Sequence, residues 1–72
     1  MDTREKIGKL EELLDLEQGT LEEDSLLSDF EEWDSIAHLS VIILLEDEFG
    51  KQVTGKQIRG FRTVRDILDV ME

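Results

Sequence analysis

The sequence predicts an all-α domain: a small four-helix bundle of three main helices and one short one, with a long first loop. Apolar residues recur at helical spacing in several segments, and helix-capping patterns precede most of those segments. No segment alternates convincingly as a strand. The 72 residues make a single domain, 1–72. A domain this small buries only about 60% of the surface of its unfolded chain, so a large enclosed active site is not expected.

The first helix is expected to begin after Asp2, because Asp2 and Glu5 have the spacing of a capping box. It should end before Gly19. Its buried face is predicted to consist of Ile7, Leu10, Leu13 and Leu14.

A long connection follows, from Gly19 to Asp34, in which helical periodicity gives way to acidic clusters and scattered large apolar residues. Long loops in compact domains are commonly functional or packed by their own side chains. We expect this one to pack over the bundle through Leu21, Leu26, Leu27, Phe30 and Trp33.

The second helix is predicted from Ser35 to about Phe49, and Gly50 suits the left-handed position after its end. Apolar residues lie on two sides of it at about 100° per residue. One side carries Val41, Ile42, Leu45 and Phe49. The opposite side carries Ile36, Leu39 and Ile43, flanked by Glu46 and Asp47. A small bundle rarely surrounds a helix completely, so one side is expected to be exposed, although burial of both remains an alternative.

Two short elements complete the chain, each opened by a capping pattern. The pattern from Thr54 to Gln57 precedes Ile58, and the pattern from Thr63 to Asp66 opens the last helix. The apolar face of the last helix is predicted to be Val64, Ile67, Leu68 and Met71.

The charge is strongly negative and unevenly distributed. The formal net charge is −11, and residues 10–50 contain 14 acids with no Lys or Arg. The eight basic and five acidic residues outside that block sum to +3. Nucleic acid is an unsuitable partner, because its binding requires cationic groups. Basic protein surfaces are the more natural partners of the acidic block, although such charge can also simply keep a small monomer in solution.

The chain has no cysteine, so disulfides and thiolate metal sites are excluded and any thiol chemistry would need an attached group. No metal site is predicted. No segment approaches the roughly 20 apolar residues of a membrane span, and the first residues are too polar for a secretory signal. We therefore expect a soluble, cytoplasmic monomer.

Ser35 is the leading candidate for the working residue. It follows a potential helix cap, Asp34, and precedes the longest apolar helical segment. A phosphate on its hydroxyl would lie at the positive end of the helix dipole, near unpaired backbone N–H groups. Alternatively, Ser35 is an ordinary residue of a helix N-terminus.

Nearly the whole chain resembles the acyl carrier proteins. The resemblance rests on Acyl groups would then be held as thioesters and delivered to loading, acyl-transfer or condensing enzymes, in fatty acid, polyketide or another specialised synthesis. The protein itself would not be an enzyme.

Two sets of residues acquire expected roles from this resemblance. Basic patches of partner enzymes would dock on exposed apolar residues with an acidic rim. The docking residues would be Asp34, Ile36, Leu39, Ile43, Glu46 and Asp47. An acyl chain sheltered between helices could be lined by Val41, Ile42, Leu45, Phe49, Ile58, Phe61, Ile67 and Leu68, for which plain core packing is the alternative.

The chain departs from the family just after the serine, where acids are common but Ala37, His38 and Ser40 stand here. This difference favours a dedicated carrier of a specialised pathway over one of general fatty acid synthesis. We expect a structural, buried or half-buried role for His38. Trp33 is expected to anchor the loop or pack on the helix start, with contact to the transferase or the arm as an alternative.

Other classes of function were weighed against the carrier. A small acidic interaction module without a prosthetic group would use Ile36, Leu39 and Ile43 as a permanent interface. The acids between residues 22 and 29 lack the spacing of an EF-hand calcium loop. A hydrolase built on Ser35 and His38 lacks a third orienting group and an enclosed oxyanion site.

Overall fold

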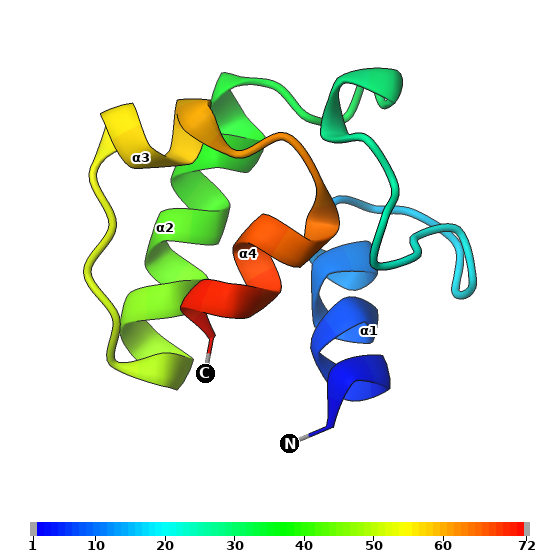
Figure 1. Ribbon diagram of the computed structural model, residues 1–72, viewed down its shortest axis with the longest axis horizontal. Coiled ribbons are helices and arrows are strands. Elements are labelled where there is room, and N and C mark those ends of the chain that lie inside the picture. Colours follow the sequence, from blue (N-terminus) through cyan, green and yellow to red (C-terminus); the bar gives the residue numbers. More distant parts are fainter. Residues whose placement is uncertain (1, 72) are drawn as a thin grey trace.

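Residues 2–71, which the computed structural model describes, contain four α-helices and one short 3-10 turn (Figure 1). The predicted all-α class is therefore confirmed. The helices are α1 (Thr3–Leu13), α2 (Ser35–Phe49), α3 (Gly55–Gly60) and α4 (Val64–Val70), and the 3-10 turn is η1 (Leu27–Asp29).

The helices pack around α1 and α2, which run in opposite directions (Figure 1). α1 contacts both α2 and α4, and α3 packs on α2 near its first turn. An ion pair between Lys9 Nζ and Glu48 Oε1, at 2.7 Å, joins α1 to the end of α2 and raises the pKa of Lys9. The first turn of α2, where Ser35 stands, therefore faces the region of α3 and the long loop.

α1 begins as predicted, since the Asp2 carboxylate accepts a hydrogen bond from Glu5 N at 2.8 Å. The helix ends at Leu13, well before Gly19. Asp15 adopts a left-handed conformation with φ of 60°, which turns the chain out of the helix without a glycine. The expected apolar face is buried at Leu10 and Leu14 and half-buried at Ile7 and Leu13.

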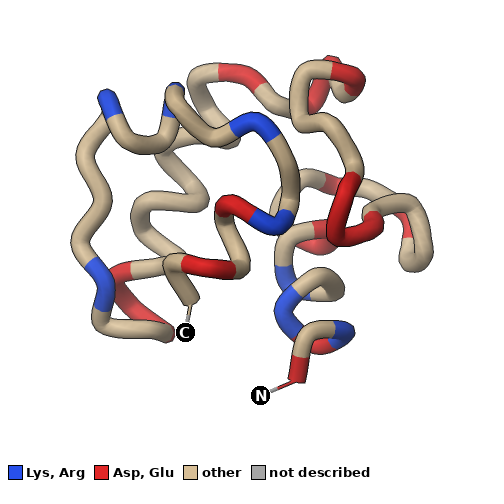
Figure 2. Tube along the Cα trace, viewed as in Figure 1, with Lys and Arg blue, Asp and Glu red and all other residues tan. Residues whose placement is uncertain are grey.

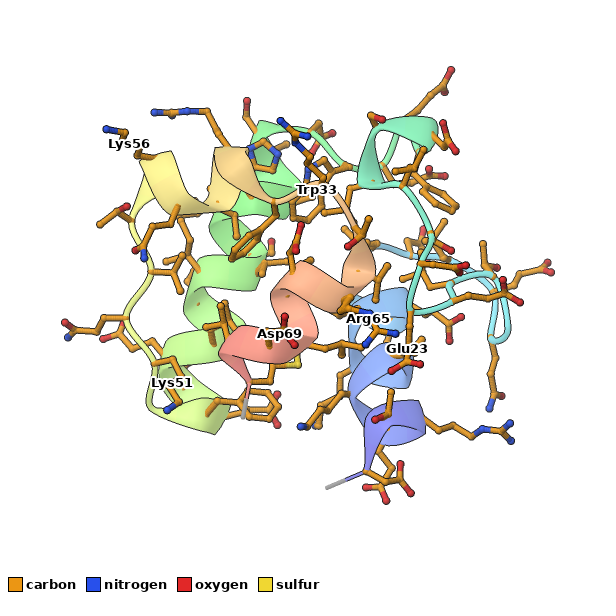
Figure 3. All side chains as sticks on the ribbon, viewed as in Figure 1. Glu23, Trp33, Lys51, Lys56, Arg65 and Asp69 are labelled. Carbon is orange, nitrogen blue, oxygen red and sulfur yellow. The ribbon has the colours of Figure 1, made fainter. Side chains whose placement is uncertain are left out.

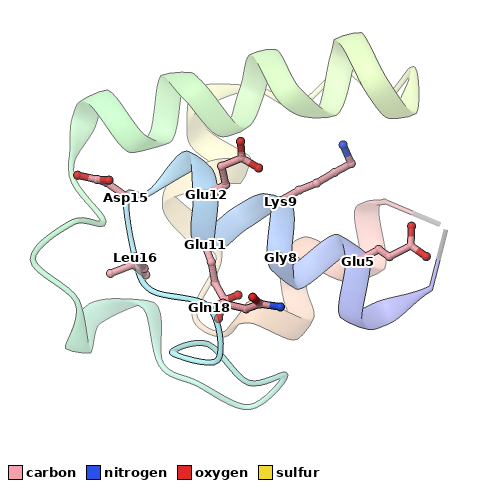
Figure 4. A pocket seen from close by; sticks show the side chains of 8 residues that line it. All are labelled: Glu5, Gly8, Lys9, Glu11, Glu12, Asp15, Leu16 and Gln18. Atoms are coloured by element: carbon pink, nitrogen blue, oxygen red, sulfur yellow. The ribbon is translucent and has the colours of Figure 1, made fainter.

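The long loop is held to α1 by a buried carboxylate that the sequence did not single out. Glu11 is only 4% exposed, and its Oε2 accepts hydrogen bonds from Gly19 N and Leu21 N, both at 2.9 Å (Figure 4). Glu11 therefore supplies acceptors that the irregular backbone would otherwise lack.

The second half of the loop is tied to the start of α4. Leu27 N donates to Arg62 O at 2.9 Å, and Val64 N donates to Ser25 O at 3.1 Å. Asp66 caps this junction by accepting from Arg62 N and Thr63 N, and these bonds lower the pKa of its carboxyl group. Backbone bonds thus fix the loop beside the connection between α3 and α4.

The loop covers the bundle through most of its apolar residues, with one exception. Leu21 and Leu27 are buried, and Phe30 and Trp33 are half-buried against the core. Leu26, in contrast, is 49% exposed, so the expectation that it packs on the bundle is wrong. Leu26 pairs with Thr63 in an isolated antiparallel bridge, and its neighbour Leu27 takes the buried position.

The boundaries of the later helices agree with the sequence prediction. α2 ends at Gly50, whose φ of 64° is left-handed. At α3, Thr54 and Gln57 exchange side-chain and backbone hydrogen bonds of 3.1 and 2.9 Å, which completes the expected capping box. The four apolar residues predicted for the last helix are all buried: Val64, Ile67, Leu68 and Met71.

Leu45→Ala should lower the free energy of unfolding by about 2–5 kcal/mol, because Leu45 has no exposed surface and its truncation leaves a cavity. Leu39→Ala on the same helix should cost less than about 0.5 kcal/mol, because that side chain is already exposed. Urea unfolding followed by circular dichroism measures both. Equal losses would contradict the assignment of a buried and an open side to α2.

Glu11→Ala should lower the free energy of unfolding by about 2–3 kcal/mol, because it leaves the Gly19 and Leu21 amides without their acceptor. Glu12→Ala, at the exposed neighbouring position of α1, is the matched control and should be nearly neutral. The same urea titration compares them. A neutral Glu11→Ala would show that the loop does not depend on this carboxylate.

Candidate functional site

Ser35 is the first residue of α2, and its side chain is exposed. The cap of this helix is Asp34, whose Oδ1 accepts a hydrogen bond from Ala37 N at 2.9 Å. Since Asp34 performs the capping, the Ser35 hydroxyl is not required for it. The serine is therefore available for chemistry at the protein surface.

The backbone around Ser35 offers unpaired donors to a group attached there. The first intrahelical hydrogen bond of α2 runs from His38 N to Asp34 O, at 2.9 Å. The N–H groups of Ser35 and Ile36 precede that bond and have no acceptor within the helix. Together with the helix dipole they favour a negative group on the Ser35 oxygen.

An exposed apolar stripe continues from Ser35 along α2. Ile36 is 75% exposed, Leu39 58% and Ile43 51%. The opposite side is closed, since Val41 and Leu45 have no exposed surface. The alternative in which both sides of this helix are buried is thus excluded. Exposed large apolar residues in a row mark a surface suited to a partner.

Acidic residues border this stripe at the far end of α2. Glu46 and Asp47 are exposed, whereas the adjacent Glu48 pairs with Lys9. The two ion pairs found within residues 2–71 leave Glu46 and Asp47 uninvolved. Figure 2 shows the acids along the first connection and at the end of α2, with the basic residues on α1 and from residue 51 to 65.

The residues expected to line an acyl chain form the core of the bundle. All eight lie among the buried or half-buried apolar residues, and Val41, Leu45 and Ile67 have no exposed surface. Their burial agrees with plain core packing.

His38 is half-buried one turn after Ser35, in agreement with the structural position expected for it. Its ring meets the edge of Trp33, with centroids 4.7 Å apart and planes at 61°. Trp33 lies between the start of α2 and the connection from α3 to α4 (Figure 3). The expectation that Trp33 anchors the loop at the helix start fits this position.

Beside these two rings is an open groove that sequence reasoning missed. It brings together three segments far apart in the chain, and its lining is Leu26, Ser28, Trp33, His38, Arg59, Phe61 and Arg62. The arginines carried no sequence signal for this position, because the pairing between the loop and the start of α4 brings them beside α2.

Comparison of this chain with protein-family models, curated proteins and solved structures found no match. Within residues 2–71, no helix is both long and apolar enough to cross a membrane. The functional argument therefore rests on the residues around Ser35 and on the exposed side of α2.

Proposed function

We propose that this protein is a carrier that holds acyl groups as thioesters on a 4′-phosphopantetheine arm attached to Ser35. The observation that carries the proposal is the exposed Ser35 hydroxyl at the first turn of α2, with capping performed by Asp34 and an open apolar stripe beside it. The resemblance of Asp34-Ser35-Ile36 to the acyl carrier signature supports the same assignment.

The residues at this position fit the proposed group. Attachment joins Ser35 Oγ to the pantetheine-bearing phosphorus of coenzyme A, while the pyrophosphate bond breaks, adenosine 3′,5′-bisphosphate leaves and the serine proton is lost. The resulting phosphodiester carries a negative charge, which the amides of Ser35 and Ile36 and the helix dipole stabilise. When bound, the arm supplies the thiol that a chain without cysteine cannot provide.

In this proposal the chain catalyses nothing, and a separate transferase modifies it. Partner enzymes with basic patches dock on the stripe of Ile36, Leu39 and Ile43, with Glu46 and Asp47 at its rim. Charge complementarity speeds the encounter, and a small apolar contact allows rapid release. Both properties suit a carrier that visits several enzymes in turn. The residues Ala37, His38 and Ser40 after the serine favour a specialised pathway.

A second candidate function is a small acidic interaction module without a prosthetic group. The exposed stripe on α2 supports it equally well, since that stripe suits a permanent partner too. The two proposals differ in whether Ser35 is modified.

Incubation with coenzyme A, Mg²⁺ and a promiscuous phosphopantetheinyl transferase should increase the intact mass by one phosphopantetheine group. Ser35→Ala should show no increase. Ser40→Ala, on the same helix, is the matched control and should be modified like the unaltered protein, because its half-buried side chain is not at the helix start. An unchanged mass, or an equal increase in Ser35→Ala, would refute the carrier and favour the interaction module.

Combined replacement of Glu46 and Asp47 by Lys should lower kcat/KM of a cognate acyl-transfer enzyme for the loaded carrier by about tenfold, because it reverses the rim charge. Glu22→Lys with Asp24→Lys makes the same charge change on the first loop and should have little effect. Circular dichroism should show both variants folded. Similar kcat/KM for the two variants would mean that the open side of α2 is not the docking surface.

A further inference from the structure

The groove that begins one turn after Ser35 has a composition unlike the rest of this acidic surface. His38 follows Ser35 by three residues, which is about 4.5 Å along the helix axis. Arg59 and Arg62 contribute from the far side, and Leu26 and Phe61 contribute apolar surface between them. A group attached to Ser35 thus has basic, aromatic and apolar surfaces within its immediate surroundings.

The two arginines are not neutralised by an ion pair. The ion pairs within residues 2–71 join Lys9 to Glu48 and Arg65 to Glu23, and neither Arg59 nor Arg62 takes part. Arg62 does contribute to the lowered pKa of Asp66, although the backbone hydrogen bonds to that carboxylate are the larger cause. In a chain with 19 acids and 8 basic residues, two arginines without a carboxylate partner on one groove leave room for an external anion. Guanidinium groups bind carboxylates in a bidentate geometry.

His38 provides a third polar group with no partner. Its Nε2 is buried and makes no hydrogen bond within the described residues 2–71. A buried polar atom left without a partner is costly and calls for an explanation in function or conformation. The Trp33 ring packs edge-on against this imidazole, so a turn of the Trp33 side chain would open Nε2 to the groove.

We propose that the groove receives the terminal carboxylate of a short acyl group carried on Ser35. Arg59 and Arg62 bind the carboxylate, His38 Nε2 gains a hydrogen-bond partner as Trp33 turns, and Phe61 with Leu26 flanks the methylene groups. This inference rests on the proposed carrier function and adds the class of its cargo: a dicarboxylic acyl group rather than a long aliphatic chain. The filled positions at Val41, Leu45 and Ile67 agree with a cargo held outside the core.

The test loads ¹⁵N-labelled protein with glutaryl- or hexanoyl-phosphopantetheine from the respective coenzyme A thioester, and intact mass confirms loading. The chain has one tryptophan and one histidine, so the indole N–H of Trp33 and the imidazole nitrogens of His38 give unambiguous NMR signals. The glutaryl group should shift both sets of signals relative to the unacylated arm. The hexanoyl group, of similar length but uncharged, should shift them much less.

Arg59→Gln with Arg62→Gln should abolish the additional glutaryl shift. Both side chains are exposed, so the fold should survive, and the spectrum of the unloaded variant checks this. Arg4→Gln with Lys51→Gln removes the same charge outside the groove and should retain the shift. Failure to load Ser35 would refute the carrier proposal itself. Successful loading with equal shifts from the two acyl groups, or with a shift that persists without the arginines, would overturn the assignment of an anionic cargo and leave the carrier standing.

Discussion

The organisation of this domain depends on a mismatch: α2 is apolar on two sides, and the other helices cover only one of them. Val41 and Leu45 are enclosed by the remainder of the bundle, whereas Ile36, Leu39 and Ile43 remain exposed. A chain of 72 residues has too little other helix to close both sides. Since burial of apolar surface drives folding, an uncovered apolar stripe is free energy left available for association. The proposed docking surface follows from this constraint.

Around that helix, the irregular segments are fixed by polar groups rather than by further core. The Glu11 carboxylate holds the amides of Gly19 and Leu21, and backbone bonds from Leu27 and Val64 join the loop to the start of α4. These contacts place Trp33 against His38 and frame the groove beside Ser35. The loop thus serves as a wall of the candidate site, in addition to connecting two helices.

Local patterns in the sequence were sufficient for the helices and for the position of Ser35. The cap at Asp34 and the left-handed Gly50 depend on a few adjacent residues, so α2 could be delimited in advance. Glu11 could not be distinguished from a solvated acid, because its role depends on a loop that returns to it. The early end of α1 depends on Asp15, which adopts a left-handed backbone without being glycine. The arginines of the groove reach the site only through contacts between distant segments, and burial of Leu27 in place of Leu26 reflects the same pairing.

The central claim, that Ser35 bears a thiol-carrying arm, is tested most directly by counting thiols in a protein that has no cysteine. The protein is purified from the cells in which it naturally occurs, treated with hydroxylamine to cleave thioesters, reduced, and titrated with a thiol reagent. The account predicts one thiol per chain, located by peptide mass spectrometry on Ser35. A chain without any thiol would contradict the carrier function and leave the open side of α2 as the surface of an unmodified interaction module.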